Sequence, residues 1–179
     1  LWMVPVLVLA GCVALPMARE EAVWRINCGG PALTDAGGTA WIADGAAAAD
    51  AAPSVTGGQA IERPASLEIA ATETPELYRT ERYGAMTYTF PVPDGVYAVR
   101  LHFAETYEGI TAVGQRVFTV NVNGLPALVD FDILQQAGAF AKPFARTVDG
   151  VVATGGSLRV EFVPKTQNPA VNAIEILRD

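Results

Sequence analysis

Hydrophobic and polar residues alternate along the chain in short runs that begin at residue 86. Met86, Tyr88 and Phe90 fall on one face of an extended segment, and threonines fall on the other face. The same alternation recurs in four later segments: 97–103, 118–122, 158–162 and 174–176. Turn-forming residues separate these runs: Pro93-Asp94-Gly95, Asn123-Gly124, Asp149-Gly150 and Gly155-Gly156. A period of two between turns predicts β-strands that bury one face.

Only one segment of the chain predicts a helix. Asp132 is suited to cap the start of residues 133–137, and Gly138 is suited to end them. Residues 30–76 are rich in Ala, Gly, Thr and Pro, which predicts long connecting loops. Many short strands with at most one short helix predict an all-β fold, a β-sandwich with long loops.

Size and composition indicate one compact domain. The 179 residues suffice for one sizeable core but not for two domains. Hydrophobic residues make up 51% of the chain and charged residues 17%, which argues against disorder. The net charge of −7 would repel phosphate backbones, so we expect no nucleic-acid partner.

Residues 1–18 are apolar and uncharged, and they predict the hydrophobic part of a secretory signal. Leu9-Ala10-Gly11-Cys12 resembles a bacterial lipobox, in which the signal is cut before a cysteine that is then lipidated. The alternative is ordinary cleavage near Ala18, with Cys12 lost. The chain begins with Leu and lacks a basic start, so we expect a truncated sequence or an unusual start codon.

The lipobox predicts where the protein resides. With Cys12 acylated, the protein would be exported and anchored to a membrane of the bacterial cell envelope, on a tether of at most ~35 Å formed by residues 13–23. With ordinary cleavage it would be secreted or periplasmic. With Cys12 acylated or removed, Cys28 would lack a partner for a disulfide bond, and we expect it to be a small buried hydrophobe.

Residues 78–84 place two tyrosines and two arginines in a predicted turn before the first alternating segment. Such side chains above a rigid sheet suit hydroxyl-rich ligands. An aromatic face takes the C–H face of a sugar, and a guanidinium group donates to its hydroxyls. The alternative is that Tyr78 and Tyr83 only cover the end of the core.

A series of short motifs runs through the chain in a fixed order: Ile26-Asn27-Cys28-Gly29-Gly30, Trp41-Ile42-Ala43-Asp44, residues 78–84, Leu101-His102-Phe103-Ala104-Glu105-Thr106-Tyr107, Gly114-Gln115-Arg116-Val117-Phe118, Val120-Asn121-Val122-Asn123-Gly124, Asp130-Phe131-Asp132-Ile133, Glu161-Phe162-Val163-Pro164 and Asn168-Pro169-Ala170-Val171-Asn172-Ala173-Ile174-Glu175. In this order and spacing, the chain from Trp24 to Leu177 resembles the malectin-like carbohydrate-binding domain. The resemblance implies that residues 24–179 form a jelly-roll-like β-sandwich. It also implies a cleft that binds glucose-containing disaccharide units through loop aromatics and an aspartate.

By this resemblance, Tyr83 and Tyr107 match two aromatic residues that contact sugar. The position after Tyr107 is often a second aromatic in the family, and here it is Glu108. The family's binding aspartate before Asn-Pro is Gln167, which can still donate and accept hydrogen bonds. Glu108 removes a stacking surface and adds a charge. Arg79 is predicted as a further polar contact to the sugar.

One further tyrosine of the family has no counterpart between Trp41 and Leu77. The sequence therefore predicts carbohydrate binding, but it does not carry over the family's specificity for glucose disaccharides. The alternative function is a structural or protein-interaction module of the same fold that has lost its sugar site.

A catalytic function is disfavoured by the residues present. Glycoside hydrolysis commonly uses two carboxyl groups, and Glu105 with Glu108, or Asp130 with Asp132, could lie close enough. Neither pair shows an evident cause for a raised pKa in the sequence. The one histidine, His102, falls in a predicted strand, and metal-ligand spacings are absent. We therefore expect no catalytic residues, no metal and no cofactor.

Overall fold

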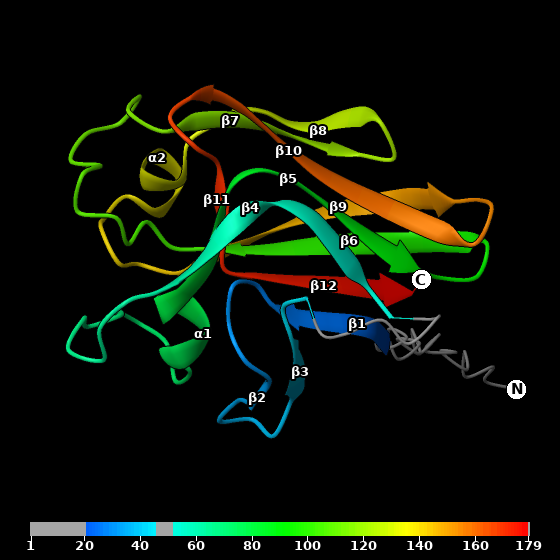
Figure 1. Ribbon diagram of the computed structural model, residues 1–179, viewed down its shortest axis with the longest axis horizontal. Coiled ribbons are helices and arrows are strands. Elements are labelled where there is room, and N and C mark those ends of the chain that lie inside the picture. Colours follow the sequence, from blue (N-terminus) through cyan, green and yellow to red (C-terminus); the bar gives the residue numbers. More distant parts are fainter. Residues whose placement is uncertain (1–20, 46–51, 179) are drawn as a thin grey trace, which may run out of the picture.

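The computed structural model describes residues 21–45 and 52–178 as a sandwich of two β-sheets, with two short helices toward one end (Figure 1). The first sheet has the strand order β2 (Leu33–Thr34), β3 (Ala40–Ala43), β1 (Glu21–Asn27), β12 (Ala173–Arg178), β6 (Gly95–Phe103) and β9 (Phe144–Ala153). The second sheet has the order β11 (Ala170–Val171), β5 (Thr80–Pro91), β10 (Ser157–Thr166), β7 (Val117–Val122) and β8 (Leu125–Phe131), and β4 (Ser54–Glu62) also pairs with β5. The helices are α1 (Glu76–Arg79) and α2 (Ile133–Ala137). The predicted all-β sandwich is confirmed.

The alternating segments bury their apolar residues between the two sheets, as predicted. Tyr88 and Phe90 of β5 and Tyr97 of β6 have no exposed surface. Phe103 of β6 packs across the sandwich against Phe131 of β8, with ring centroids 4.9 Å apart. Burial of each large apolar side chain stabilises the fold by about 1.5–3 kcal/mol. This core fixes the strands whose ends carry the candidate site.

Two local predictions are confirmed as well. The Asp132 carboxylate accepts a hydrogen bond of 3.0 Å from the N–H of Gln135 and so caps α2. Gly138 ends this helix with a φ of 73°, and its N–H donates to the carbonyl of Leu134. Cys28 is a free, fully buried cysteine, and burial raises the pKa of its thiol well above the usual value.

The segment before Met86 differs from the predicted turn. Tyr78 lies in α1, a second helix beyond the one expected, and the strand β5 already includes Tyr83. The first half of β5 lacks the pattern of large apolar residues that marks its second half. Its fully buried residues are instead polar: Thr80 is 3% exposed and Glu81 is 1% exposed. Because glutamate is rarely buried, a search for alternating apolar residues does not detect this half of the strand.

The prediction of loops throughout residues 30–76 is wrong for the short strands β2 and β3 and for the longer strand β4. This strand pairs with β5 from Ser54 to Glu62 and has no buried residue, so no hydrophobic alternation marks it. Gly57 adopts a φ of 78° at an irregularity in the pairing. A Cβ atom at this position would lie 2.4 Å from the carbonyl oxygen of Ala85. The glycine therefore lets β4 approach β5 closely.

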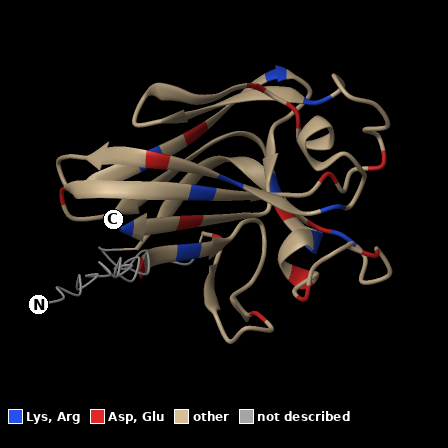
Figure 2. Cartoon of the chain, turned by 180° about the vertical axis from the view of Figure 1, so that it is seen from behind, with Lys and Arg blue, Asp and Glu red and all other residues tan. Residues whose placement is uncertain are grey.

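Basic and acidic residues are interspersed over the strands and the connecting loops (Figure 2). Several of them form ion pairs, such as Arg25 with Glu175 at 3.1 Å and Lys165 with Asp130 at 2.6 Å. Among the described residues, no helix is both long and apolar enough to cross a membrane. Cys12 and the predicted leader lie outside the described residues.

Candidate functional site

A cleft lies where β4, β5, the loop after β6 and the loop before β11 come together. Its volume is about 220 Å³, and it is lined by Ile61, Arg63, Glu81, Tyr83, Tyr107, Arg116, Gln167 and Asn168. The structure thus brings together three of the predicted site residues: Tyr83, Tyr107 and Gln167. They come from three separate segments of the chain.

Tyr83 is positioned by strand pairing on both sides. In β5 it lies opposite Gln59 of β4 and opposite Ala170 of β11. Its hydroxyl group donates a hydrogen bond of 2.8 Å to the side-chain oxygen of Gln59. The N–H of the next residue, Gly84, donates to the carbonyl of Pro169, which ties the strand to the loop before β11. The half-buried ring of Tyr83 is therefore held by the sheet.

Tyr107 is the more exposed of the two cleft tyrosines, with 44% of its surface accessible. The guanidinium carbon of Arg63 lies 5.7 Å from the centre of its ring. Gly109 packs against the same ring, since a Cβ atom at this position would lie 2.5 Å from the ring atom Cε1. The ring is therefore held in place while it still presents an open surface.

A closed set of hydrogen bonds forms part of the cleft floor. Arg63 donates 2.6 Å from Nη2 to the Glu81 carboxylate and 3.2 Å from Nε to the hydroxyl of Thr106. The Thr106 hydroxyl in turn donates 3.0 Å to the other oxygen of Glu81. A buried carboxylate needs such partners, because an unpaired buried charge costs several kcal/mol. The set links the end of β4 to β5 and to the loop after β6.

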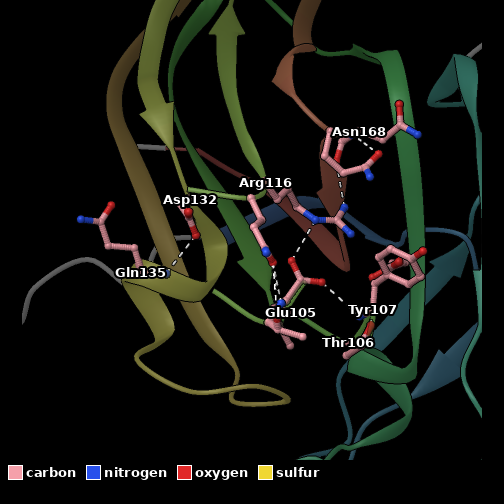
Figure 3. A network of polar contacts seen from close by, with 12 residues as sticks. Glu105, Thr106, Tyr107, Arg116, Asp132, Gln135 and Asn168 are labelled. Carbon is pink, nitrogen blue, oxygen red and sulfur yellow. Dashed lines mark hydrogen bonds and ion pairs between the residues drawn. The ribbon is translucent and has the colours of Figure 1, made fainter. Parts of the chain in front are cut away.

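A second ion pair lies beside the first and is drawn in Figure 3. Arg116 Nε lies 2.8 Å from Glu105 Oε2, although its N–H is not directed at that oxygen, and Nη1 donates 2.9 Å to the carbonyl of Asn168. The other oxygen of Glu105 accepts 3.0 Å from the N–H of Tyr107. Burial raises the pKa of Glu105 to about 6, against the opposing effect of Arg116. No feature of the sequence indicates this raised pKa.

Gln167 turns the chain at the edge of the cleft. Its backbone has a φ of 62°, which a residue other than glycine adopts at some cost. Its side-chain oxygen accepts a hydrogen bond of 3.0 Å from the N–H of Asn168. Its side-chain nitrogen has no hydrogen-bond partner within the described residues. The Gln167 amide is therefore oriented with its donor group available to a ligand.

The sequence model of the Malectin domain family matches residues 22–174. The chain belongs to the malectin domain family. Mouse malectin (Mus musculus) is 33% identical over 178 residues, which cover 88% of this chain and 57% of the relative. A probable LRR receptor-like serine/threonine-protein kinase of Arabidopsis thaliana is 35% identical over 96 residues, which cover 50% of this chain and 9% of the kinase. The chain thus spans just over half of mouse malectin and a small part of the kinase.

Solved structures with this malectin fold come from larger proteins. The plant receptor-like kinase FER gives a TM-score of 0.73 at 24% identity, over 88% of this chain and 49% of that one. A β-glucuronidase of Bacteroides uniformis gives a TM-score of 0.75 at 19% identity, over 87% of this chain and 18% of the enzyme. At these identities the likeness concerns the fold alone.

The malectin domain places two predicted site residues outside the cleft. Arg79 donates 3.0 Å from Nε to the carbonyl of Leu67 and lies 3.9 Å from Glu76, so it braces α1 and a neighbouring loop. Glu108 is exposed and borders two adjoining hollows instead. Tyr78 follows the alternative interpretation, because it is buried in the core and its hydroxyl lies 3.0 Å from His102 Nδ1. Burial raises the pKa of Tyr78 to about 12.

Sequence reasoning missed the residues that form the floor of this malectin cleft. Ile61 lies in the edge strand β4 and Arg63 follows it, and no hydrophobic alternation marks this strand in the sequence. Arg116 lies in the motif of residues 114–118, to which the sequence assigns no role. Ile61 contributes an aliphatic wall to the cleft. Across residues 21–45 and 52–178, no group of three or more His, Cys, Asp or Glu side chains is placed to hold a metal ion.

Proposed function

We propose that this malectin domain binds neutral carbohydrate in the cleft between Tyr83 and Tyr107 without transforming it. The observation that carries the proposal is that both tyrosines open onto one cleft beside Gln167. Aromatic rings stack on the C–H faces of sugar rings, and amide groups bond the hydroxyls at the edges. A glucose-containing oligosaccharide is the ligand that the family resemblance favours.

The charges around the cleft favour a neutral ligand. Both arginines of the lining are paired with buried carboxylates: Arg63 with Glu81 and Arg116 with Glu105. These pairs offer no uncompensated positive charge for the carboxylate or sulfate of an acidic sugar. The interspersed charges and the net charge of −7 likewise argue against a nucleic-acid partner.

The same pairs argue against glycoside hydrolysis. A general acid must present its proton to the ligand, and a nucleophile must present a free oxygen. Glu105 uses one oxygen for the N–H of Tyr107 and holds the other 2.8 Å from Arg116. Glu81 has both oxygens engaged by Arg63 and Thr106. We therefore assign these carboxylates to the support of the cleft.

The experiment that tests the proposal is a glycan array, followed by isothermal titration calorimetry on the glycans retained. We expect dissociation constants between about 1 μM and 1 mM, or −8 to −4 kcal/mol. Tyr83→Ala and Tyr107→Ala should each abolish measurable binding. Val152→Ala is the control, since it truncates an exposed apolar residue of β9 that does not line the cleft. Unchanged binding by both tyrosine variants would refute the site.

A protein-interaction module is the second candidate function. Two observations favour it: Glu108 stands where the family often has an aromatic, and the fold also occurs in a plant receptor complex with the peptide RALF23. That structure is 23% identical to this chain and so bears on the fold alone. An array with no retained glycan would favour this candidate over carbohydrate binding.

We also propose that Cys12 anchors the protein to a membrane of the cell envelope through a lipid. The support is the motif Leu9-Ala10-Gly11-Cys12 at the end of an apolar run. Cys12→Ser should move the protein from the membrane fraction to the soluble fraction of expressing bacteria. Retention of that variant in the membrane fraction would contradict the lipid anchor and leave the sugar site unaffected.

A further inference from the structure

The tyrosine cleft is the first of three neighbouring hollows that share walls. Arg63 and Tyr107 also line a second hollow of about 420 Å³, together with Pro64 and Glu108. Glu108 then borders a third hollow of about 410 Å³, whose lining includes Phe140. The three hollows therefore follow one another around the loop that succeeds β6.

Backbone hydrogen bonds fix the third hollow relative to the first. The N–H of Ala141 donates 2.8 Å to the carbonyl of Glu105, and the carbonyl of Ala141 accepts 3.0 Å from the N–H of Ala70. Phe140 therefore precedes Ala141, which is hydrogen-bonded to the loop after β6 that carries Tyr107. The N–H of Ile110 also donates 2.9 Å to the carbonyl of Tyr107. The two aromatic side chains are thus mounted on one connected framework.

The third hollow has the chemistry of a sugar platform. Phe140 is 38% exposed, and Ile110 and Leu134 add aliphatic surface. Thr111 and Glu108 supply polar groups at the edges. Among the described residues, those that line this hollow include no lysine or arginine, and Glu108 would repel an acidic glycan. An aromatic ring with hydroxyl and carboxylate neighbours suits a neutral sugar.

The size of the first cleft indicates that a ligand extends beyond it. Its volume of about 220 Å³ is below the roughly 300–1,000 Å³ of typical small-molecule sites. Tyr107 and Arg63 separate it from the second hollow, and Tyr107 is accessible over 44% of its surface. A ligand stacked at Tyr107 therefore has a direct route toward Glu108 and Phe140.

We infer that a neutral glycan chain runs from the Tyr83–Tyr107 cleft past Glu108 to a second aromatic platform at Phe140. This inference rests on the proposed function and deepens it. The domain then binds segments of an oligosaccharide or polysaccharide longer than a disaccharide. Phe140 supplies the second stacking surface that Glu108 does not supply at the position after Tyr107.

The test is calorimetry with α-1,4- and β-1,3-linked gluco-oligosaccharides of two to six residues. We expect the affinity to rise at least tenfold from the disaccharide to the hexasaccharide of the bound linkage. Phe140→Ala should remove most of this gain and leave the disaccharide affinity within twofold of the wild type. Phe140→Trp should retain the gain, and the control Val152→Ala should change neither value.

The outcomes separate the inference from the proposed function. Equal affinity for all lengths, or an equal loss at every length in Phe140→Ala, would overturn the extended groove. Tyr107-dependent binding of the disaccharide would in that case still support the sugar site. Absence of binding to every glycan of the array as well as to these oligosaccharides would overturn both.

Discussion

The guanidinium carbon of Arg63 lies 5.7 Å from the centre of the Tyr107 ring, while its Nη2 donates 2.6 Å to the buried carboxylate of Glu81. One side chain therefore joins the most exposed ring of the cleft to the buried floor. A cation over an aromatic face contributes about 0.5–1 kcal/mol at an exposed site. Without Arg63 the Glu81 carboxylate would be buried without its cation, which is strongly destabilising, so we expect Arg63 to control both the stability and the shape of the cleft.

Removal of Arg63 should destabilise the protein and weaken sugar binding together. Arg63→Ala leaves Glu81 buried without its cation, and the loss of one partner of a buried pair costs about 3–5 kcal/mol. Chemical denaturation should show this loss, and calorimetry should show weaker binding of any glycan that the wild type retains. Arg79→Ala is the matched control, because Arg79 lies outside the cleft and should leave the affinity unchanged. Equal effects of the two variants on affinity would contradict this role for Arg63.

The pH dependence of stability should report the buried carboxyl group of Glu105. Its pKa is raised from 4.5 to about 6, so the folded state binds a proton more tightly than the unfolded state. The resulting stabilisation is full below pH 4.5 and is lost as the pH rises through about 6. The shift corresponds to about 2 kcal/mol. Relative to Glu105→Gln, the wild type should therefore lose about that much unfolding free energy between pH 4.5 and 7.

Denaturation curves of both proteins across this pH range give the measurement. Glu108→Gln is the control, because Glu108 is exposed and its replacement should leave the wild-type pH profile unchanged. If Glu105→Gln instead follows the wild type at every pH, then Glu105 does not titrate in this window.

The contact of Gly109 with Tyr107 predicts a selective loss of binding. A methyl group at residue 109 would lie 2.5 Å from the ring atom Cε1, so the ring must move. Gly109→Ala should weaken sugar binding about tenfold and change stability little, because the loop is exposed. Gly95→Ala is the control, since its Cβ would meet only ordinary contacts at 3.5 Å or more. Wild-type affinity in Gly109→Ala would show that the ring position does not matter.

The sequence predicted the sandwich because its central strands alternate strictly. Leu158 and Phe162 of β10, like Phe118 of β7, are buried at the positions that a period of two requires. It also predicted three residues of the cleft, because the family resemblance fixes their positions. These features depend on local pattern or on motif order, both of which are visible in one chain.

The sequence could not predict the floor of the cleft. Glu81 is buried although it falls outside the period of two that Met86 and the following apolar residues set, and its partner Arg63 follows a strand with no buried residue. The pairing is non-local, so no spacing along the chain reveals it. Arg79 belongs to the Tyr78–Gly84 stretch of tyrosines and arginines, whereas no motif of the sequence marks Arg63. Only the pairing of β4 with β5 shows which arginine reaches the cleft.

Restoration of the family's aspartate at residue 167 should strengthen binding of glucose disaccharides. Gln167 has a φ of 62°, a region that aspartate tolerates better than most residues, so Gln167→Asp should not strain the backbone further. A carboxylate accepts hydrogen bonds from sugar hydroxyls about twice as strongly as an amide oxygen does. We expect about a tenfold gain in affinity, or 1.4 kcal/mol, by calorimetry with the disaccharide. Gln167→Asn has the same shorter side chain as Gln167→Asp but keeps a neutral amide, so it should give no gain. A loss of affinity in Gln167→Asp would mean that the amide nitrogen of Gln167 donates an essential bond to the ligand.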